Sequence, residues 1–323
     1  MPVTGFLAAD ELEAARRCVS RHARRTPVLT SRLLDEETGF RVALKAEMFQ
    51  RTGSYKIRGA LNKLRTLTDE QRGRGVVCSS AGNHAQGVAL AAALNGVRAV
   101  VVMAENATPA KVAATRAYGA EVVLHGAIWD DADARARELA AEQGLTFVHP
   151  FDDLDLIAGQ ATLGLELVED VPDVDVVVVP IGGGGLISGV ALAVKSRRPA
   201  ARVVGVESSG APGMRDSVRA GHAVTLDRVD CVIDGLRVRR VGETTCRVVA
   251  ACVDEIVTLP DEAIFESVVW LMSRQKLVAE GAAAAPVAAL RAGLVRAAPG
   301  ARVACVLSGG NLGLDQLRGL AWN

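Results

Sequence analysis

Short uncharged runs rich in valine alternate with longer segments rich in alanine along most of this chain of 323 residues. A short, uninterrupted apolar run is typical of a strand that is buried on both faces. The alanine-rich segments are long enough to form helices, and strands that alternate with helices form parallel sheets covered on both faces. The sequence therefore predicts an α/β fold. Its strands are expected at residues 75–78, 99–103, 122–124, 176–180, 203–206 and 303–307, and its helices include 83–94, 130–142 and 262–274.

Composition limits the classes of partner. The 37 basic residues balance the 37 acidic ones, so no overall charge attracts nucleic acid or an anionic membrane, and small molecules are the expected partners. The six cysteines show no C-x-x-C pair and no zinc-like spacing with histidine, so we expect buried thiols. The first residues lack the basic start and apolar core of a secretory signal, and the expected location is the cytoplasm.

One uncharged stretch, residues 176–194, is about as long as a membrane-spanning helix. Pro180 and four successive glycines interrupt it, and a turn exposed to lipid would leave backbone polar groups unsatisfied. The stretch is better explained as a strand, a loop and a helix, so no membrane association is expected.

Four predicted loops contain glycine and polar residues in patterns that an ordinary turn does not require. The first, Gly53-Ser54-Tyr55-Lys56, leads into a predicted helix. The helix dipole disfavours a positive charge there, so a neutral lysine that forms an imine suits the position better than an ammonium. Taken alone, Lys56 is also compatible with a solvated surface lysine.

The second loop, Ser79-Ser80-Ala81-Gly82-Asn83-His84, follows a predicted strand and opens a helix. Free backbone N–H groups and hydroxyls at such a turn can bind an anion such as a carboxylate. Ser80 or Asn83 could equally be an ordinary helix cap, and His84 a structural histidine.

The third loop contains four glycines, Gly182 to Gly185, whose backbone can close around a phosphate. It is not a Walker loop, and the G-x-G-x-x-G spacing fails because Ile187 or Ser188 occupies the last glycine position. Glu207 ends the next predicted strand, where a ribose-binding acid would lie. A nicotinamide-dependent oxidoreductase is therefore a rival prediction.

The fourth loop, Ser308-Gly309-Gly310-Asn311, follows the last predicted strand. A serine hydroxyl can donate to or accept from a ring nitrogen without imposing a charge. Parallel α/β sheets bind ligands at the carboxyl ends of their strands, where at least three of the four loops fall. The sequence therefore indicates a ligand site built from these loops.

Six segments in this order resemble the pyridoxal-phosphate enzymes of fold type II: GSYKIRGALNKL, SSAGNHAQG, IAGQATLGLE, VPIGGGGLISG, AEGAAA and LSGGN. The resemblance extends from about residue 26 to residue 314 and is strongest to the catabolic threonine and serine dehydratases, with serine racemase a near relative. It implies a two-lobed, tryptophan synthase β-like fold with parallel-rich sheets and the cofactor between the lobes. The expected large lobe is residues 1–70 and 152–323 and the small lobe 71–151, without a C-terminal regulatory domain.

The resemblance also implies roles for individual residues. Lys56 would form the Schiff base with pyridoxal 5'-phosphate, and Tyr55 would stack on the ring where the family usually has phenylalanine. Asn83 would hydrogen-bond the ring hydroxyl, and Ser308 would meet the ring nitrogen. The residues expected to bind the cofactor are Tyr55, Lys56, Asn83, Gly182, Gly183, Gly184, Gly185, Leu186 and Ser308. Those expected to bind the substrate are Ser54, Ser80, Asn83 and His84. Three further residues stand at family positions close to the cofactor: Asp234, Gly235 and Glu280.

The implied reaction is the removal of water from a hydroxy amino acid, L-threonine or L-serine, to give a 2-oxo acid and ammonia. Lys56, with its pKa lowered by burial, would remove the Cα proton. In serine racemase a serine at the position of Ala81 is the second base, and alanine cannot carry a proton. A lyase is therefore expected rather than a racemase.

Several alternatives stay open. The basic stretch Arg237 to Arg240 is either a solvated patch or a contact for an acidic substrate such as a hydroxyaspartate. Glu207 and Ala211 match the metal site of the racemases, but Gly213 stands where an acid is expected, so no metal is predicted. A racemase or β-replacement enzyme on the same scaffold, or a non-catalytic binding protein, completes the alternatives. The family implies a homodimer or homotetramer.

Overall fold

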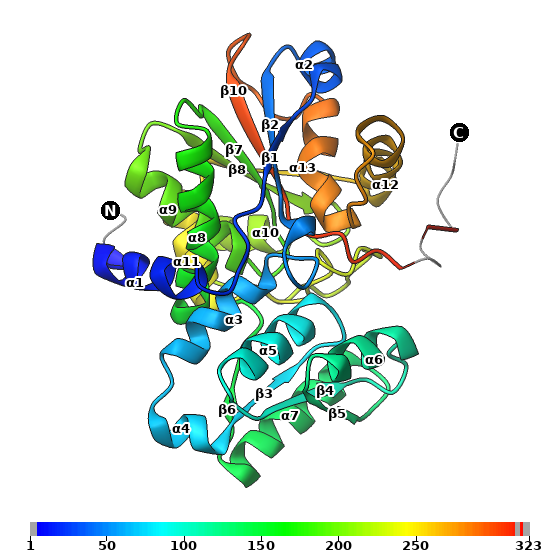
Figure 1. Cartoon of the computed structure of the whole chain (residues 1–323). Helices are drawn as coiled ribbons and strands as arrows, with labels where there is room; N and C mark the ends of the chain where they lie inside the picture. The colour runs from blue at the N-terminus through cyan, green and yellow to red at the C-terminus, as the bar shows by residue number, and fades with distance from the viewer. Residues whose placement is uncertain (1–4, 314–316, 319–323) are drawn as a thin grey trace.

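The structure, a computed structural model, describes residues 5–313 and 317–318. Its strands form two sheets that lie in two lobes, one above the other in Figure 1. The larger sheet has the order β1-β2-β10-β7-β8-β9, and the smaller one has the order β5-β4-β3-β6. Every neighbouring pair is parallel except β1 and β2. Both sheets therefore present the carboxyl ends of their parallel strands along one edge.

The strands are short, and most of their residues are buried. Those of the larger sheet are β1 (Val28–Thr30), β2 (Arg41–Ala46), β7 (Val176–Pro180), β8 (Arg202–Ser208), β9 (Glu255–Leu259) and β10 (Arg302–Leu307). Those of the smaller sheet are β3 (Val76–Ser79), β4 (Ala99–Met103), β5 (Glu121–Leu124) and β6 (Thr146–Phe147).

Helices cover both faces of each sheet (Figure 1). They are α1 (Ala9–Val19), α2 (Arg32–Thr38), α3 (Lys56–Arg65), α4 (Asp69–Arg74), α5 (Asn83–Leu94), α6 (Pro109–Ala117), α7 (Trp129–Gln143), α8 (Leu154–Asp170), α9 (Gly185–Arg197), α10 (Gly213–Ala220), α11 (Glu243–Cys252), α12 (Asp261–Trp270) and α13 (Gly281–Arg291). A 3-10 turn spans Glu47–Phe49, and a π-helical segment spans Leu271–Gln275. Among the described helices, none has both the length and the apolar character needed to cross a membrane.

The alternating residues of the strands divide the interior into layers. Val177 and Val179 pack with α8, α9 and α11 on one face of the larger sheet, while Val176 and Val178 pack with α12 and α13 on the other. The smaller sheet is covered by α3 and α5 on one face and by α7 on the other. Because helices cover both faces of the sheets, the amino-acid sequences of the buried strands are continuous apolar runs.

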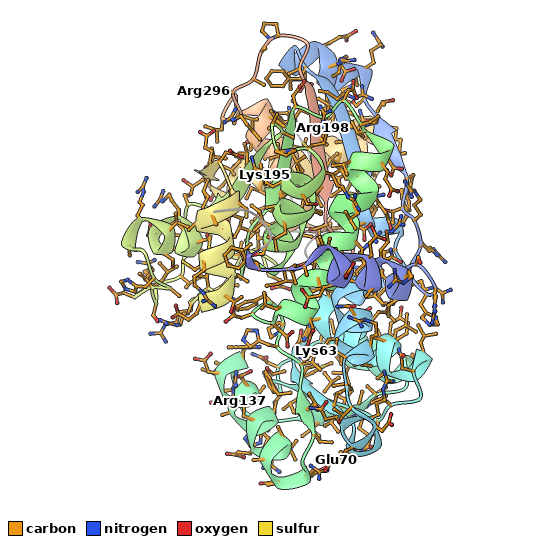
Figure 2. All side chains as sticks on the ribbon, turned by 90° about the vertical axis from the view of Figure 1, so that its left-hand side faces the viewer. Lys63, Glu70, Arg137, Lys195, Arg198 and Arg296 are labelled. Carbon is orange, nitrogen blue, oxygen red and sulfur yellow. The ribbon has the colours of Figure 1, made fainter. Side chains whose placement is uncertain are left out.

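Helix α3 connects the lobes. It packs against α5 of the smaller lobe and against α8 of the larger one. Lys63, near the end of α3, lies at the waist of the molecule in Figure 2 and forms ion pairs with Asp153 and Asp155 at 2.7 and 3.1 Å. The first residue of this helix is Lys56, so the candidate lysine is positioned where the two lobes meet.

The predicted α/β fold class is confirmed, and all six predicted strands are present. The predicted helix at 262–274 is divided between α12 and the π-helical segment. Strands β1, β2, β6 and β9 were not predicted from the sequence. The domain boundaries stay a prediction, and the outermost ends of the predicted large lobe, residues 1–4 and 319–323, lie outside the described residues.

Candidate active site

Backbone hydrogen bonds join the first and fourth loops, although they come from opposite ends of the chain. The N–H of Tyr55 donates to the carbonyl of Ser308 at 3.1 Å, and that of Gly310 donates to Gly53 at 2.9 Å. Ser54 and Gly309 form an isolated antiparallel bridge between these two contacts. The two loops are therefore one unit, formed where β10 ends beside β2.

Lys56 is the first residue of α3, and its amine donates a 2.7 Å hydrogen bond to the carbonyl oxygen of Pro150. The amine lies 5.4 Å from the centre of the Tyr55 ring. Burial lowers the pKa of Lys56 to about 8, against the opposing charge of Glu280. A lysine with this pKa is partly neutral near neutral pH, which is the form that attacks a carbonyl carbon.

Asn83 connects the second loop to the fourth. Its side-chain amide donates to both carboxylate oxygens of Glu280, at 2.8 and 3.0 Å. The backbone N–H of Glu280 in turn donates to the carbonyl of Gly309 at 3.1 Å. Burial raises the pKa of Glu280, while the hydrogen bond from Asn83 opposes this shift. This contact brings the beginning of α5 to the loops around Lys56.

The second loop offers hydrogen-bond donors rather than a charge. The Oγ of Ser80 accepts from the N–H of Gly82 at 3.1 Å, and the first N–H groups of α5, which begins at Asn83, have no acceptor within the helix. His84 is 3% exposed, and burial lowers its pKa to about 3, so its ring is neutral. Its Nε2 donates to the carbonyl of Val148 at 3.0 Å. A carboxylate would therefore be bound by dipoles at the helix N-terminus.

The four glycines form a cradle at the beginning of α9. Gly184 has φ of 95°, a left-handed conformation that favours glycine, and caps the helix. A Cβ on Gly183 would lie 2.2 Å from the ring of Phe151. The Oγ1 of Thr245 lies 2.8 Å from the carbonyl oxygen of Gly183, to which it donates. The cradle therefore has no room for side chains and presents the N–H groups of a helix N-terminus, which suits a phosphate.

Other predicted residues lie around these loops. Ser308 is 2% exposed at the end of β10, and Ser54 is buried with an Oγ that has no hydrogen-bond partner. The carbonyl of Gly235 lies against the cradle, 2.3 Å from where a Cβ on Gly182 would be. Asp234, beside it, forms a 3.0 Å ion pair with Lys111 of the smaller lobe. Leu186 is buried in the first turn of α9.

Glu207 has a structural partner. Its carboxylate accepts from the backbone N–H groups of Met214 and Arg215 at 2.7 and 2.9 Å, at the beginning of α10. Burial raises its pKa to about 7. This carboxylate caps a helix and is not available to a ribose. Ala211 is buried, and no three His, Cys, Asp or Glu side chains of the described residues gather in a way that could hold a metal ion.

The basic stretch makes contacts with its own loop. Arg240 forms an ion pair with Glu243 at 2.6 Å and a hydrogen bond with Thr225, and Arg239 donates to the carbonyl of Leu226. Arg237 is exposed. Such contacts are typical of a solvated charged patch.

Sequence reasoning missed several residues that shape the site. They are Pro150 and Phe151, which contact Lys56 and the cradle, and Asp152, Thr245 and Asn311. Asn311 belongs to the LSGGN segment, so its place in a motif was a usable signal. Pro150 contributes its backbone carbonyl, a group that every residue has, so its sequence gives no signal. Thr245 is an ordinary helix residue in the sequence, and only the fold shows its contact with Gly183.

The residues present fit pyridoxal phosphate. An amine of lowered pKa suits its aldehyde, the glycine cradle suits its phosphate, and the buried hydroxyl of Ser308 suits a ring nitrogen. Fold and site together define the class as a pyridoxal-phosphate enzyme of fold type II.

Comparison with known proteins gives the same class of enzyme. The family of pyridoxal-phosphate-dependent enzymes matches residues 19–309, and this chain belongs to it. An L-threonine ammonia-lyase of Thermotoga maritima is 45% identical over 97% of this chain and 77% of its own length. The catabolic L-threonine dehydratase TdcB of Escherichia coli is 43% identical over 96% of this chain and 95% of its own. The solved structure of maize serine racemase has a TM-score of 0.91 and 36% identity, covering 96% of this chain and 95% of that one.

These matches confirm the predicted family, the cofactor and the class of enzyme, a pyridoxal-phosphate-dependent ammonia-lyase. The rival prediction of a nicotinamide-dependent oxidoreductase is wrong. The roles of the individual site residues stay predictions.

Proposed function

We propose that this enzyme removes water from L-threonine or L-serine and releases a 2-oxo acid and ammonia, with Lys56 as the residue that carries the cofactor. The observation that supports this most is the buried amine of Lys56, with a pKa of about 8, which donates to Pro150, the residue before the Phe151 that contacts the glycine cradle. Tyr55, the neighbour of Lys56, is bonded to Ser308, and the charge of Lys56 acts on His84 of the second loop. Relatives named for threonine ammonia-lyase and dehydratase activity support the choice of substrate.

In this proposal each residue of the site has its own role. The N–H groups at the beginning of α5, with Ser80, bind the substrate carboxylate and orient Cα toward Lys56. The bound cofactor supplies the electron sink for loss of the Cα proton. The amine of Lys56 accepts that proton, which its lowered pKa allows. Ser308 is buried and carries no charge, so its hydroxyl would hold the ring nitrogen of the cofactor as a neutral partner.

Elimination is favoured over racemisation because only one base is proposed. Ala81 lies in the loop before α5, at the position of the second base in serine racemase, and its methyl group cannot carry a proton. Without a base on the opposite face, the proton taken from Cα can return only to the face from which Lys56 removed it, so this chain offers no route to the D-enantiomer. The net forward reaction would then be loss of the β-hydroxyl as water, with a proton added to its oxygen. The likeness to maize serine racemase makes racemisation the second candidate.

The test is a panel of L-threonine, L-serine, D-serine and 3-hydroxyaspartate assayed for 2-oxo acid and ammonia. L-Threonine or L-serine should give both products in equal amounts, and D-serine should give neither. Lys56→Ala should lose more than about a thousandfold in rate together with the yellow colour. Lys63→Ala, on the same helix, should keep the colour. A colourless wild-type protein that cannot be reconstituted, or turnover of 3-hydroxyaspartate alone, would contradict the proposal.

The proposal includes a homodimer or homotetramer in the cytoplasm. All six cysteines are free thiols, which suits a reducing compartment. Sedimentation of the purified holoenzyme measures the assembly, and a monomer at micromolar concentration would contradict it.

A further inference from the structure

Three polar side chains, those of Asn311, Asn83 and Glu280, form a continuous hydrogen-bonded row between the carbonyl of Thr52 and the beginning of α13. The amide nitrogen of Asn311 donates to the carbonyl of Thr52 at 2.8 Å and to the Oδ1 of Asn83 at 2.7 Å. The amide nitrogen of Asn83 donates onward to the carboxylate of Glu280. Both ends of this row, a backbone carbonyl and a carboxylate, are acceptors.

These acceptors fix the orientation of both amides. A carbonyl oxygen cannot donate, so the group of Asn311 that faces Thr52 must be its NH2. The second hydrogen of that NH2 then points to Asn83 and requires an oxygen there. With its Oδ1 bound by Asn311, Asn83 presents its own NH2 on the other side, where the nitrogen lies 2.8 and 3.0 Å from the two carboxylate oxygens of Glu280. The oxygens of one carboxylate lie too close together to accept both hydrogens of an NH2 in good geometry, so they share one N–H of Asn83 and the other N–H is left for a further acceptor.

The fold provides a fitted place for Asn311. Gly53 has φ of 70°, and a Cβ on it would lie 2.4 Å from the Oδ1 of Asn311. The backbone bond from Gly310 to Gly53 holds the two segments together at this point. A larger residue at position 53 would therefore displace Asn311 from Thr52.

We propose that Asn311 is a positioning residue, which fixes the amide of Asn83 so that an N–H donor, and not an oxygen, faces the cofactor's ring hydroxyl. An ionised ring oxygen requires a donor, and a reversed amide would oppose it with a second acceptor. The inference rests on the proposed role of Asn83 in cofactor binding. It assigns to Asn311 no contact with the substrate.

The test is a double-mutant cycle on the affinity for pyridoxal phosphate, measured by equilibrium titration of the apoenzyme, together with the position of the visible absorption band. Asn311→Ala should weaken cofactor binding by about tenfold and shift the band as Asn83→Ala does. In the Asn83→Ala background the same change should cost less than about twofold. Asn311→Asp, which keeps the shape but loses the donor, should be at least as damaging as Asn311→Ala.

Asn106→Ala is the matched control, because Asn106 is an exposed asparagine of the smaller lobe with one backbone contact, to Ala127. It should leave affinity and band unchanged, and urea unfolding of the apoproteins shows whether each variant folds. Equal losses from Asn311→Ala in both backgrounds, or an Asn311→Asp variant with normal affinity, would overturn the inference alone. If Asn83→Ala itself changes neither quantity, the proposed role of Asn83 fails with it.

Discussion

The amine of Lys56 and the carbonyl oxygen of Pro150 are 2.7 Å apart, and this contact links the lysine to the phosphate cradle. The residue after Pro150 is Phe151, whose ring lies where a side chain on Gly183 would be. Asp152 follows, and its carboxylate accepts from the first N–H groups of α11 at 2.9 to 3.1 Å. One short segment therefore sets the position of both the amine and the cradle.

The lowered pKa of Lys56 predicts how the apoenzyme captures its cofactor. The neutral amine is the reactive form, and it predominates above the pKa of about 8. The rate of pyridoxal phosphate binding should therefore rise with pH through a midpoint near 8 and level off above it. Stopped-flow absorbance checks this, and a midpoint near the ordinary lysine pKa of about 10.4 would contradict it.

Glu280 should shift that midpoint. Its negative charge raises the pKa of Lys56, in opposition to the effect of burial. Glu280→Gln removes the charge at nearly constant shape, so the midpoint should move to lower pH. The same stopped-flow experiment measures it, and an unchanged midpoint would show that the charge of Glu280 does not act on the amine.

Thr245 should support the phosphate cradle. Its buried hydroxyl donates to the carbonyl of Gly183 at 2.8 Å, and Thr245→Val keeps the shape but leaves that carbonyl without its donor. The expected loss is about 1 kcal/mol of cofactor binding, or roughly fivefold in affinity. Thr244→Val, one residue earlier on α11, is the matched control. Equal affinities for both variants in equilibrium titration would argue against this role.

Ala81 should limit racemisation. Ala81→Ser introduces a hydroxyl at the position of the proposed missing base. The ratio of D-serine to 2-oxo acid formed from L-serine should then rise by at least about tenfold. Chiral chromatography measures the ratio, and Ala81→Gly, which adds no hydroxyl, should leave it unchanged. A wild-type enzyme that makes D-serine as fast as 2-oxo acid would refute the one-base proposal.

Arg58, two residues after Lys56, should stabilise the fold. Its guanidinium is fully buried and forms ion pairs with Glu47 and Glu166, both at 2.8 Å. Arg58→Met removes the ion-pair partner of Glu47, which is fully buried, and one of the two cations that pair with Glu166, which should cost about 3–5 kcal/mol in the free energy of unfolding. Urea unfolding of the apoenzyme measures the loss. Arg135→Met removes exposed ion pairs on α7 and should leave the midpoint unchanged.

Five of the six strands that the sequence predicted are buried on both faces. The sixth, β5, is an edge strand of the smaller sheet and has a short apolar run but no buried residue. The strands that were missed contain charges, are very short or lie at a sheet edge. Strand β2 contains Arg41 and Lys45, and Lys45 is buried because Glu166 and Asp170 pair with its amine. Strand β9, at the sheet edge, is only partly buried, and β6 has two residues. Such strands depend on partners distant in the sequence, which a local pattern does not show.

The residues of the candidate site also fall into a set that the sequence predicted and a set that it did not. Gly184 was predicted because four successive glycines are a local signal, and Lys56 because the six ordered segments resemble the family. Pro150 was missed because it contributes a main-chain oxygen, and Thr245 because its partner, the carbonyl of Gly183, is distant in the sequence. The fold must be known before either contact can be inferred.

The pairing of β2 with β10 has a consequence for biosynthesis. The ribosome makes Arg41–Ala46 long before its neighbour Arg302–Leu307, and the loops that hold Lys56 and Ser308 depend on that pairing. Until β10 emerges, the candidate cofactor site lacks one wall and β2 has an open edge on that side. The nascent chain must therefore complete β10 before it can bind pyridoxal phosphate at this site.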